Sequence, residues 1–254
     1  MKNTLFLFLF SLFLIACGDG SSTSKNNSKV GENSSESDSN STKSSSSSVV
    51  IPGLTGNLID SRDGQTYKTV QIGSQTWMAQ NLNYETASSY CYNDSASYCA
   101  KYGRLYTWAV AMDSAGTWTT NGKGCGNDKT CSPTYPVRGV CPSGWHLPTQ
   151  TEWNTLFTAV GGQSTASTKL KSSSGWNFGG NGTDAFGFSA LPAGGRDCNG
   201  DYDNEGYDVY FWSSTENDSD FACDMNLDFF FDDGYAHLDD LNKCNGFSVR
   251  CLKN

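Results

Sequence analysis

The chain has 254 residues, of which 26 are acidic and 17 are basic, so its formal net charge at pH 7 is −9. This charge argues against a nucleic-acid partner, because contacts to phosphates need a basic surface. Residues 49–254 hold 22 of the acidic and 13 of the basic residues, and they are numerous enough for one well-packed domain.

Residues 1–17 are typical of a secretion signal. Lys2 supplies a positive start, and residues 5–15 are apolar apart from Ser11. This run is shorter than the roughly 20 residues that a membrane-spanning helix requires. The ending Leu14-Ile15-Ala16-Cys17 resembles the lipobox of bacterial lipoproteins, and Gly18 after it resembles the outer-membrane sorting pattern. We therefore predict acylation of Cys17 and a lipid anchor in the outer membrane or at the cell surface. The alternative is an ordinary signal peptide cleaved nearby.

Residues 18–48 are predicted to form a disordered, serine-rich tether. In residues 21–48, serine occupies 14 of the 28 positions, no residue is aromatic, and Val30 is the one aliphatic side chain. Such a composition buries too little apolar surface to offset the entropy of ordering the chain. The globular domain is therefore expected to comprise residues 49–254.

The first half of this domain is expected to be rich in strands and loops. Residues 57–72 predict a β-hairpin with Asp63-Gly64 at its turn, and a further strand follows at 76–78. Residues 99–112 are expected to end in a short helix. The glycine-, asparagine- and threonine-rich residues 117–136 predict a loop.

The clearest helix signal begins at Thr149. Thr149 and Glu152 have the spacing of a capping box, in which each side chain accepts the backbone N–H of the other residue. Apolar residues then follow at helical spacing, namely Trp153, Leu156, Phe157 and Val160. Gly161-Gly162 is expected to end the helix. We predict that this is the one long, well-capped helix of the domain.

The rest of the chain again predicts strands. Residues 186–192 and 210–216 are short aromatic stretches, and residues 221–231 alternate between apolar and polar side chains. The same alternation at 247–251 indicates that Cys251 faces inward. Few helices, many short strands and long irregular loops are typical of an α+β domain.

Nine cysteines follow Cys17, and export together with this number favours disulfide bonds over a metal cluster or redox thiols. Connectivity cannot be deduced from the sequence, but spacing suggests pairs. Cys91 with Cys99 and Cys125 with Cys131 would each close a short loop.

Two longer disulfides are also predicted. Cys223 and Cys244 are equidistant from the Asp233-Gly234 turn, so a hairpin centred there would place them opposite each other. Cys141 with Cys251 would then join the middle of the domain to its last strand. Cys198 has no predicted partner in this scheme and would be a free thiol or form an intermolecular disulfide.

Six motifs, taken together and in this order, resemble those of the Fibrobacter succinogenes major paralogous domain family. They lie at residues 63–83, 102–108, 141–148, 187–192, 211–216 and 246–251. The resemblance implies a fold similar to C-type lectins and to formylglycine-generating enzymes. The activity of the family is uncharacterised, so the resemblance implies a fold and not a reaction.

The acidic stretch 197–205 raises the possibility of a calcium site. An oxygen-bearing side chain recurs at every second position, namely at Asp197, Asn199, Asp201, Asp203 and Glu205. Calcium takes six to eight oxygen ligands, often from one flexible loop. The pattern departs from an EF-hand loop, because Tyr202 occupies the position that needs glycine and Asp208 the position of the bidentate glutamate. The competing interpretation is a solvated acidic loop. No other cofactor is expected.

Aromatic residues near these acids suggest carbohydrate binding, since exposed rings stack on sugars. The candidate ligand-binding residues are Tyr202, Tyr207, Tyr210 and Trp212. The domain lacks the Glu-Pro-Asn and Trp-Asn-Asp tripeptides of calcium-dependent lectins, and part of this aromatic content must fill the core. The leading hypothesis is a surface-displayed, non-enzymatic binding or adhesion domain for polysaccharide.

Two alternatives to this hypothesis stay open. One is a protein-interaction module that binds a surface protein. The other is an enzyme, either one acting on polysaccharide or one that oxidises cysteine as the formylglycine-generating enzymes do. Cys198, Cys223 and Cys244 are the spare thiols that the last activity could use.

Overall fold

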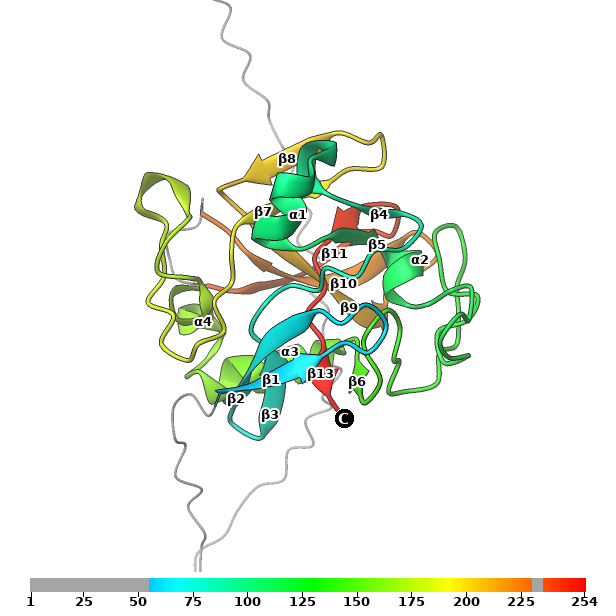
Figure 1. Ribbon diagram of the computed structural model, residues 1–254, viewed down its shortest axis with the longest axis horizontal. Helices are drawn as coiled ribbons and strands as arrows, with labels where there is room; N and C mark the ends of the chain where they lie inside the picture. Colours follow the sequence, from blue (N-terminus) through cyan, green and yellow to red (C-terminus); the bar gives the residue numbers. More distant parts are fainter. Residues whose placement is uncertain (1–54, 230–234) are drawn as a thin grey trace, which may run out of the picture. The chain divides into compact units, whose positions relative to one another are not determined.

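The computed structural model describes residues 55–229 and 235–254 (Figure 1). The predictions for Cys17, for the signal and tether at 1–48 and for the Asp233-Gly234 turn therefore lie outside the described residues. Within those residues, no helix has both the length and the apolar character needed to cross a membrane.

Two β-sheets form the framework of the described domain. The first sheet has the spatial order β1 (Thr55–Ile59), β2 (Thr66–Ile72), β3 (Gln75–Met78), β13 (Leu252–Lys253) and β6 (Trp145–His146). The second has the order β11 (His237–Asn242), β10 (Phe221–Leu227), β9 (Val209–Glu216), β7 (Ala193–Arg196), β12 (Gly246–Phe247), β5 (Leu105–Thr107) and β4 (Ser89–Tyr90), and β8 (Tyr202–Glu205) pairs with β7. Figure 1 shows the C-terminal strand β13, in red, between two strands from earlier in the chain.

The helices are short and few among these strands. They are α1 (Ala96–Tyr102), α2 (Trp108–Ala111), α3 (Gln150–Ala159) and α4 (Gln163–Leu170), with 3₁₀ turns η1 (Tyr92–Asp94) and η2 (Asn177–Gly179). The predicted α+β class is confirmed, as are the hairpin formed by β1 and β2 and the short helix α2. Helices α1 and α4 were not predicted, because their mostly small and polar sequences carry no clear apolar stripe.

Helix α3 begins as its sequence predicts. The backbone N–H of Glu152 donates to Thr149 Oγ1 at 3.2 Å, and the backbone N–H of Thr149 donates to Glu152 Oε2 at 2.8 Å. The buried face of α3 joins the core shared by the two sheets, where the Trp153 ring stacks on Trp77 of β3 with centroids 4.5 Å apart. Trp153 also lies 6.0 Å from the Phe211 ring of β9. The helix therefore ties the two sheets together.

The chain passes from the second sheet to the first through residues 248–251, which we call the seam. The Ser248 carbonyl accepts the N–H of Trp212, while the Val249 carbonyl accepts that of Leu82 and the Cys251 carbonyl that of Met78. Because the seam has packed structure on both sides, both of its alternating faces are buried. Cys251 is inward as predicted, and Arg250 is only 1% exposed.

Strand β10 shows the same departure from simple alternation. Its apolar side chains are buried, as the pattern predicts, but Asp224 and Asn226 on the opposite face are buried too. The strand lies inside the second sheet, between β9 and β11. Its polar face is therefore covered instead of facing water.

The structure has four disulfide bonds among the described residues. Three are the predicted pairs Cys91–Cys99, Cys125–Cys131 and Cys141–Cys251. The predicted Cys223–Cys244 pair is wrong, because Cys244 bonds to Cys198 instead. Cys223 is buried and takes no part in these four bonds.

The error came from the register of the β10–β11 hairpin. Phe221 pairs with Asn242 and Cys223 with Asp240, so the hairpin is centred two residues before the position assumed from the Asp-Gly turn. Cys244 therefore lies beyond the end of β11. There it meets Cys198, in the turn between β7 and β8.

Candidate functional site

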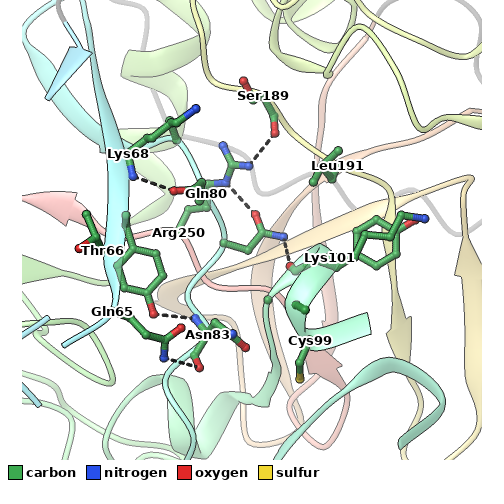
Figure 2. A pocket seen from close by; sticks show the side chains of 16 residues that line it. Gln65, Thr66, Lys68, Gln80, Asn83, Cys99, Lys101, Ser189, Leu191 and Arg250 are labelled. Carbon is green, nitrogen blue, oxygen red and sulfur yellow. Dashed lines mark hydrogen bonds between the residues drawn. The ribbon is translucent and has the colours of Figure 1, made fainter. Parts of the chain in front are cut away.

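A cavity of about 350 Å³ lies beside the C-terminal turn of α1, and we call it the α1 cavity (Figure 2). Its lining comes from separate stretches of the chain, at 65–68, 79–83, 99–103, 189–191 and Arg250 of the seam. Strand β2 and the segment after β3 form one wall, and α1 forms the other. The site is therefore built by the tertiary fold and not by one local motif.

Gly103, which ends α1, allows the two walls to approach closely. Its φ is +77°, and a Cβ atom at this position would lie 2.8 Å from the carbonyl oxygen of Leu82. A side chain here would be both strained and in collision with backbone. The disulfide between Cys91 and Cys99 also ties α1 to the segment that precedes it. The α1 wall is thus held in place before any ligand arrives.

Asn81 connects the two walls at the base of the cavity. Its Nδ2 donates to the carbonyl oxygen of Tyr102 at 2.8 Å, and its Oδ1 accepts Arg250 Nε at 2.8 Å. Arg250 Nη2 donates to the Ser189 carbonyl at 2.9 Å, as Figure 2 shows. Arg250 also donates through Nη1 to the Phe188 carbonyl. These bonds fix the side chains of Asn81 and Arg250.

A second group of lining residues consists of amides and a phenol. Gln80 Oε1 accepts the backbone N–H of Lys68 at 2.7 Å, and Tyr67 Oη accepts that of Asn83 at 3.0 Å. Gln65 Nε2 donates to the Asn83 carbonyl at 3.1 Å. The side-chain oxygen Oδ1 of Asn83 is buried and accepts no hydrogen bond from any described residue. A buried acceptor of this kind is uncommon unless something else donates to it.

The titratable groups that line the cavity are lysine, arginine and tyrosine. Burial raises the pKa of Tyr67 to about 12 and that of Tyr102 well above its usual range. Burial lowers the pKa of Arg250 to about 9, so its guanidinium stays protonated at neutral pH. The lining has no aspartate, glutamate or histidine among the described residues. The charged groups in the described lining of the α1 cavity are therefore all positive.

A second hollow of about 540 Å³ shares Gln65, Asn83, Cys99 and Ala100 with the α1 cavity. Of its charged side chains, Asp63 accepts hydrogen bonds from Gln65, and the other three are in ion pairs. Arg62 donates to Asp60, and Arg104 lies 2.9 Å from Glu85. The shared lining residues make it a continuation of the same surface depression, toward the start of α1.

The four aromatic residues predicted to bind ligand do not form one site. Trp212 is fully buried and its Nε1 donates to the Tyr106 carbonyl, so it belongs to the core. Tyr210 stacks on the core residue Phe247 at 4.8 Å. Tyr202 donates to Asp94 Oδ1 at 2.6 Å and packs beside Tyr92. The prediction is wrong for Trp212, because β9 lies inside its sheet and buries that side chain.

Tyr207 belongs to an aromatic cluster with a strongly exposed member. Its ring centroid lies 5.8 Å from that of Phe178 and 5.9 Å from that of Phe229. Phe178 is 80% exposed and has a φ of +50°, which is rare for a residue other than glycine. We call Phe178, Tyr207 and Phe229 the aromatic cluster.

The five residues predicted to bind calcium lie along the β7–β8 hairpin. Asp197 is in its turn, where Oδ1 accepts the backbone N–H groups of Asn199, Gly200 and Asp201. Glu205 pairs with Ala193 at the other end and accepts the hydroxyl of Tyr102. A strand rises about 3.4 Å per residue, so the hairpin separates these two carboxylates widely. In the part of the chain that the structure describes, no three Asp, Glu, His or Cys side chains are grouped as metal ligands.

His146 and the three thiols considered for cysteine oxidation lie outside the lining of the α1 cavity. His146 is buried, and its ring nitrogens bond to Asn254 Oδ1 at 2.7 Å and to Glu152 Oε1 at 2.9 Å. Of the three thiols considered for cysteine oxidation, Cys198 and Cys244 form a disulfide with each other. None of these residues lines the cavity.

The fold and the cavity together define a disulfide-stabilised α+β domain with a polar, positively charged cavity built between β2 and α1. The model of the Fibrobacter succinogenes major domain matches residues 70–253, and the chain belongs to this family. No significant match was found among curated proteins or among solved structures. The family match includes most of the cavity lining, but Gln65, Thr66, Tyr67 and Lys68 precede it.

Proposed function

We propose that this chain is a cell-surface lipoprotein whose domain binds a hydroxyl-rich ligand, such as a saccharide, in the α1 cavity without transforming it. The observation that carries the proposal is the unused acceptor Asn83 Oδ1 in a cavity whose charged lining residues, Lys68, Lys101 and Arg250, are donors. A sugar hydroxyl donates and accepts at once, so one ligand can satisfy both kinds of group. The lectin-like fold that the family resemblance implies is part of the same proposal.

The chemistry of the lining supports binding over catalysis. General acid–base catalysis needs a group whose pKa lies near the working pH, most often histidine or a carboxyl group. The described lining has neither, and its tyrosines are held protonated by burial. Such groups orient a ligand through hydrogen bonds.

The experiment is a pull-down of the full chain, solubilised in detergent, on insoluble polysaccharides. We expect saturable binding without release of soluble sugar. Asn83→Ala should weaken binding by about 5-fold to 30-fold, which corresponds to one lost hydrogen bond of about 1–2 kcal/mol. Asn154→Ala is the matched control, because Asn154 is exposed on α3 and does not line the cavity. Absence of saturable binding, or an equal loss in both variants, would contradict the proposal.

A protein partner is the second candidate, and the aromatic cluster favours it. Exposed aromatic side chains are enriched where proteins bind each other. If Phe178→Ala abolishes capture of a surface protein while the cavity variant Asn83→Ala retains it, the binding face is the aromatic cluster and not the α1 cavity.

The lipid anchor is tested separately. Cys17→Ala should move the protein from the membrane fraction to the soluble fraction, because acyl chains supply about 0.8 kcal/mol per buried CH₂ group. The measurement is fractionation followed by immunoblotting, with Cys223→Ala as a control that removes a cysteine from the domain. Unchanged fractionation of Cys17→Ala would show that the protein is not anchored through this residue.

A further inference from the structure

The charge of the α1 cavity is opposite to that of the chain. The chain has a net charge of −9, yet the charged residues in the described lining are Lys68, Lys101 and Arg250. Lys101 is partly neutralised, because its Nζ lies 3.2 Å from Glu205 Oε1 outside the lining. Lys68 and Arg250 form no ion pair with any described residue. The cavity is thus a local concentration of positive charge on an acidic protein.

Arg250 is the unusual member of this set, since a guanidinium is rarely buried without a carboxylate beside it. Its three hydrogen-bond acceptors are all neutral: Asn81 Oδ1 and the carbonyl oxygens of Phe188 and Ser189. The faces of the Phe188 and Phe211 rings pack near it, with centroids 4.3 Å and 5.3 Å from its Cζ. Asp184 acts on Arg250 only through its charge, and its oxygens accept the N–H and hydroxyl of Ser189.

Arg250 lines the cavity, although it is only 1% exposed. Of its three hydrogen bonds, the one from Nη2 to Ser189 is not fully buried, and both residues line the cavity (Figure 2). A guanidinium has five N–H donors, and three have acceptors within the protein. Lys68, on the β2 wall of the same cavity, is exposed and can bring a flexible ammonium group to the same ligand.

We propose that the ligand of the α1 cavity carries a carboxylate and that Arg250 and Lys68 bind it, which makes an acidic saccharide the ligand class. This inference rests on the proposed function and specifies its ligand. The carboxylate supplies a directly bonded anionic partner, which Arg250 has in no described residue, in the planar geometry that suits a guanidinium. A bare anion would leave Asn83 Oδ1 without a donor, whereas the hydroxyl groups of a sugar acid provide one.

The test is isothermal titration of the full chain in detergent with matched soluble probes. These are oligomers of galacturonate and of glucuronate, their methyl esters, and inorganic phosphate. We expect an acidic oligomer to bind at least about 10-fold more tightly than its methyl ester, with affinity that falls as salt is added. Phosphate should bind more weakly than the acidic oligomer, because it lacks the planar carboxylate and the several hydroxyl groups of the sugar.

Lys68→Gln is the informative variant, because Lys68 is exposed and its loss should leave the fold intact. We expect it to weaken binding of the acidic oligomer about 5-fold to 10-fold and to leave binding of the methyl ester unchanged. Lys123→Gln makes the same charge change at an exposed position outside the cavity and should have no effect. Arg250→Lys is assayed at a temperature where its near-ultraviolet spectrum is native. We expect its preference for the acidic oligomer over the methyl ester to be smaller than that of Lys68→Gln.

Three other results of the titrations would overturn the carboxylate inference. Equal affinity for acidic oligomers and their esters would overturn the carboxylate inference and leave the proposed function standing. Tighter binding of phosphate than of any acidic oligomer would overturn it in favour of a simple anion site. If no saccharide of either kind binds, both the inference and the proposed function fail.

Discussion

Replacing both Cys141 and Cys251 by alanine is expected to lower the free energy of unfolding by about 4–5 kcal/mol. The bond joins residues 110 apart in sequence, and the chain-entropy model assigns a disulfide of this span about that value. Both cysteines are fully buried, and Cys251 belongs to the seam that joins the two sheets. For a domain of this size the midpoint of thermal unfolding should fall by about 8–20 °C, measured by circular dichroism.

The Cys91–Cys99 bond provides the control, because its cysteines are only 8 residues apart. The same model gives a smaller loss, about 2–3 kcal/mol, when both are replaced by alanine. Equal losses for the two pairs would show that the entropy of the unfolded chain is not the source of the stabilisation. The short-loop variant should still weaken ligand binding, since this bond holds the α1 wall of the cavity.

Apart from the Cys141–Cys251 bond, which joins residues 110 apart, the features that were predicted correctly depend on residues close together in the chain. The capping box at Thr149 and Glu152 spans four residues, and the two short-loop disulfides are likewise local. The hairpin formed by β1 and β2 follows from one turn and its flanking strands. In each case the local sequence contains all the groups that form the structure.

Burial by distant parts of the chain limited several other predictions. Alternation at 247–251 predicted the direction of Cys251, but it could not show that the other face of the seam packs against Phe188 and Asn81. The same limitation concealed the burial of Trp212, whereas the pairing of Cys198 with Cys244 was missed because of the hairpin register. Periodicity indicates which side chains share a face, and it does not indicate what covers that face.

The α1 cavity could not be predicted for the same reason, because its lining comes from stretches between residues 65 and 250. One signal was present in the sequence. Arg250 lies in a short apolar stretch with Val249, Cys251 and Leu252, where a long cation is out of place unless it has a specific environment. A charged residue within such a stretch is therefore worth testing as part of a site.

Asp224→Asn is expected to stabilise the domain at neutral and alkaline pH. Asp224 is fully buried in β10, and neither carboxyl oxygen accepts a hydrogen bond from another described residue. Its cross-strand neighbour is Asp239, and Asp240 lies next to that residue. Burial, and then the charges of these two acids, raise the pKa of Asp224 well above its usual range. Ionising this carboxyl group in the folded protein is therefore costly.

The direction of the pH effect follows from proton binding. Because its pKa is raised in the folded state, Asp224 binds a proton more tightly there than in the unfolded chain, so stability falls as the pH rises above the usual carboxyl range. Burial also raises the pKa of Asp239 and Asp208, with the same consequence. The raised pKa of His146 adds stability that is complete below pH 6.5 and is lost as the pH rises through its folded value.

Carboxyl groups with a lowered pKa act at the other end of the pH range. Despite burial, hydrogen bonds from Arg62 lower the pKa of Asp60, and those from His146 and Thr149 lower that of Glu152. The stability that these two groups contribute is present above their usual pKa and is lost as the pH falls through the folded values. The groups with a raised pKa, described above, instead lose stability between about pH 5 and about pH 8. The wild-type domain should therefore unfold at a higher temperature at about pH 5 than at about pH 8.

The variant Asp224→Asn distinguishes the contribution of Asp224 to the pH dependence of stability from that of the other titratable groups. Asp224→Asn should raise the free energy of unfolding by about 1–3 kcal/mol at about pH 8 and change it little at about pH 5, which flattens the pH profile measured by urea unfolding. Asp203→Asn removes the same charge from an exposed position on β8 and should leave the profile unchanged. If Asp224→Asn destabilises the domain equally at both pH values, then the carboxyl group makes a favourable interaction that an amide cannot replace. The raised pKa would in that case not be the source of the pH dependence.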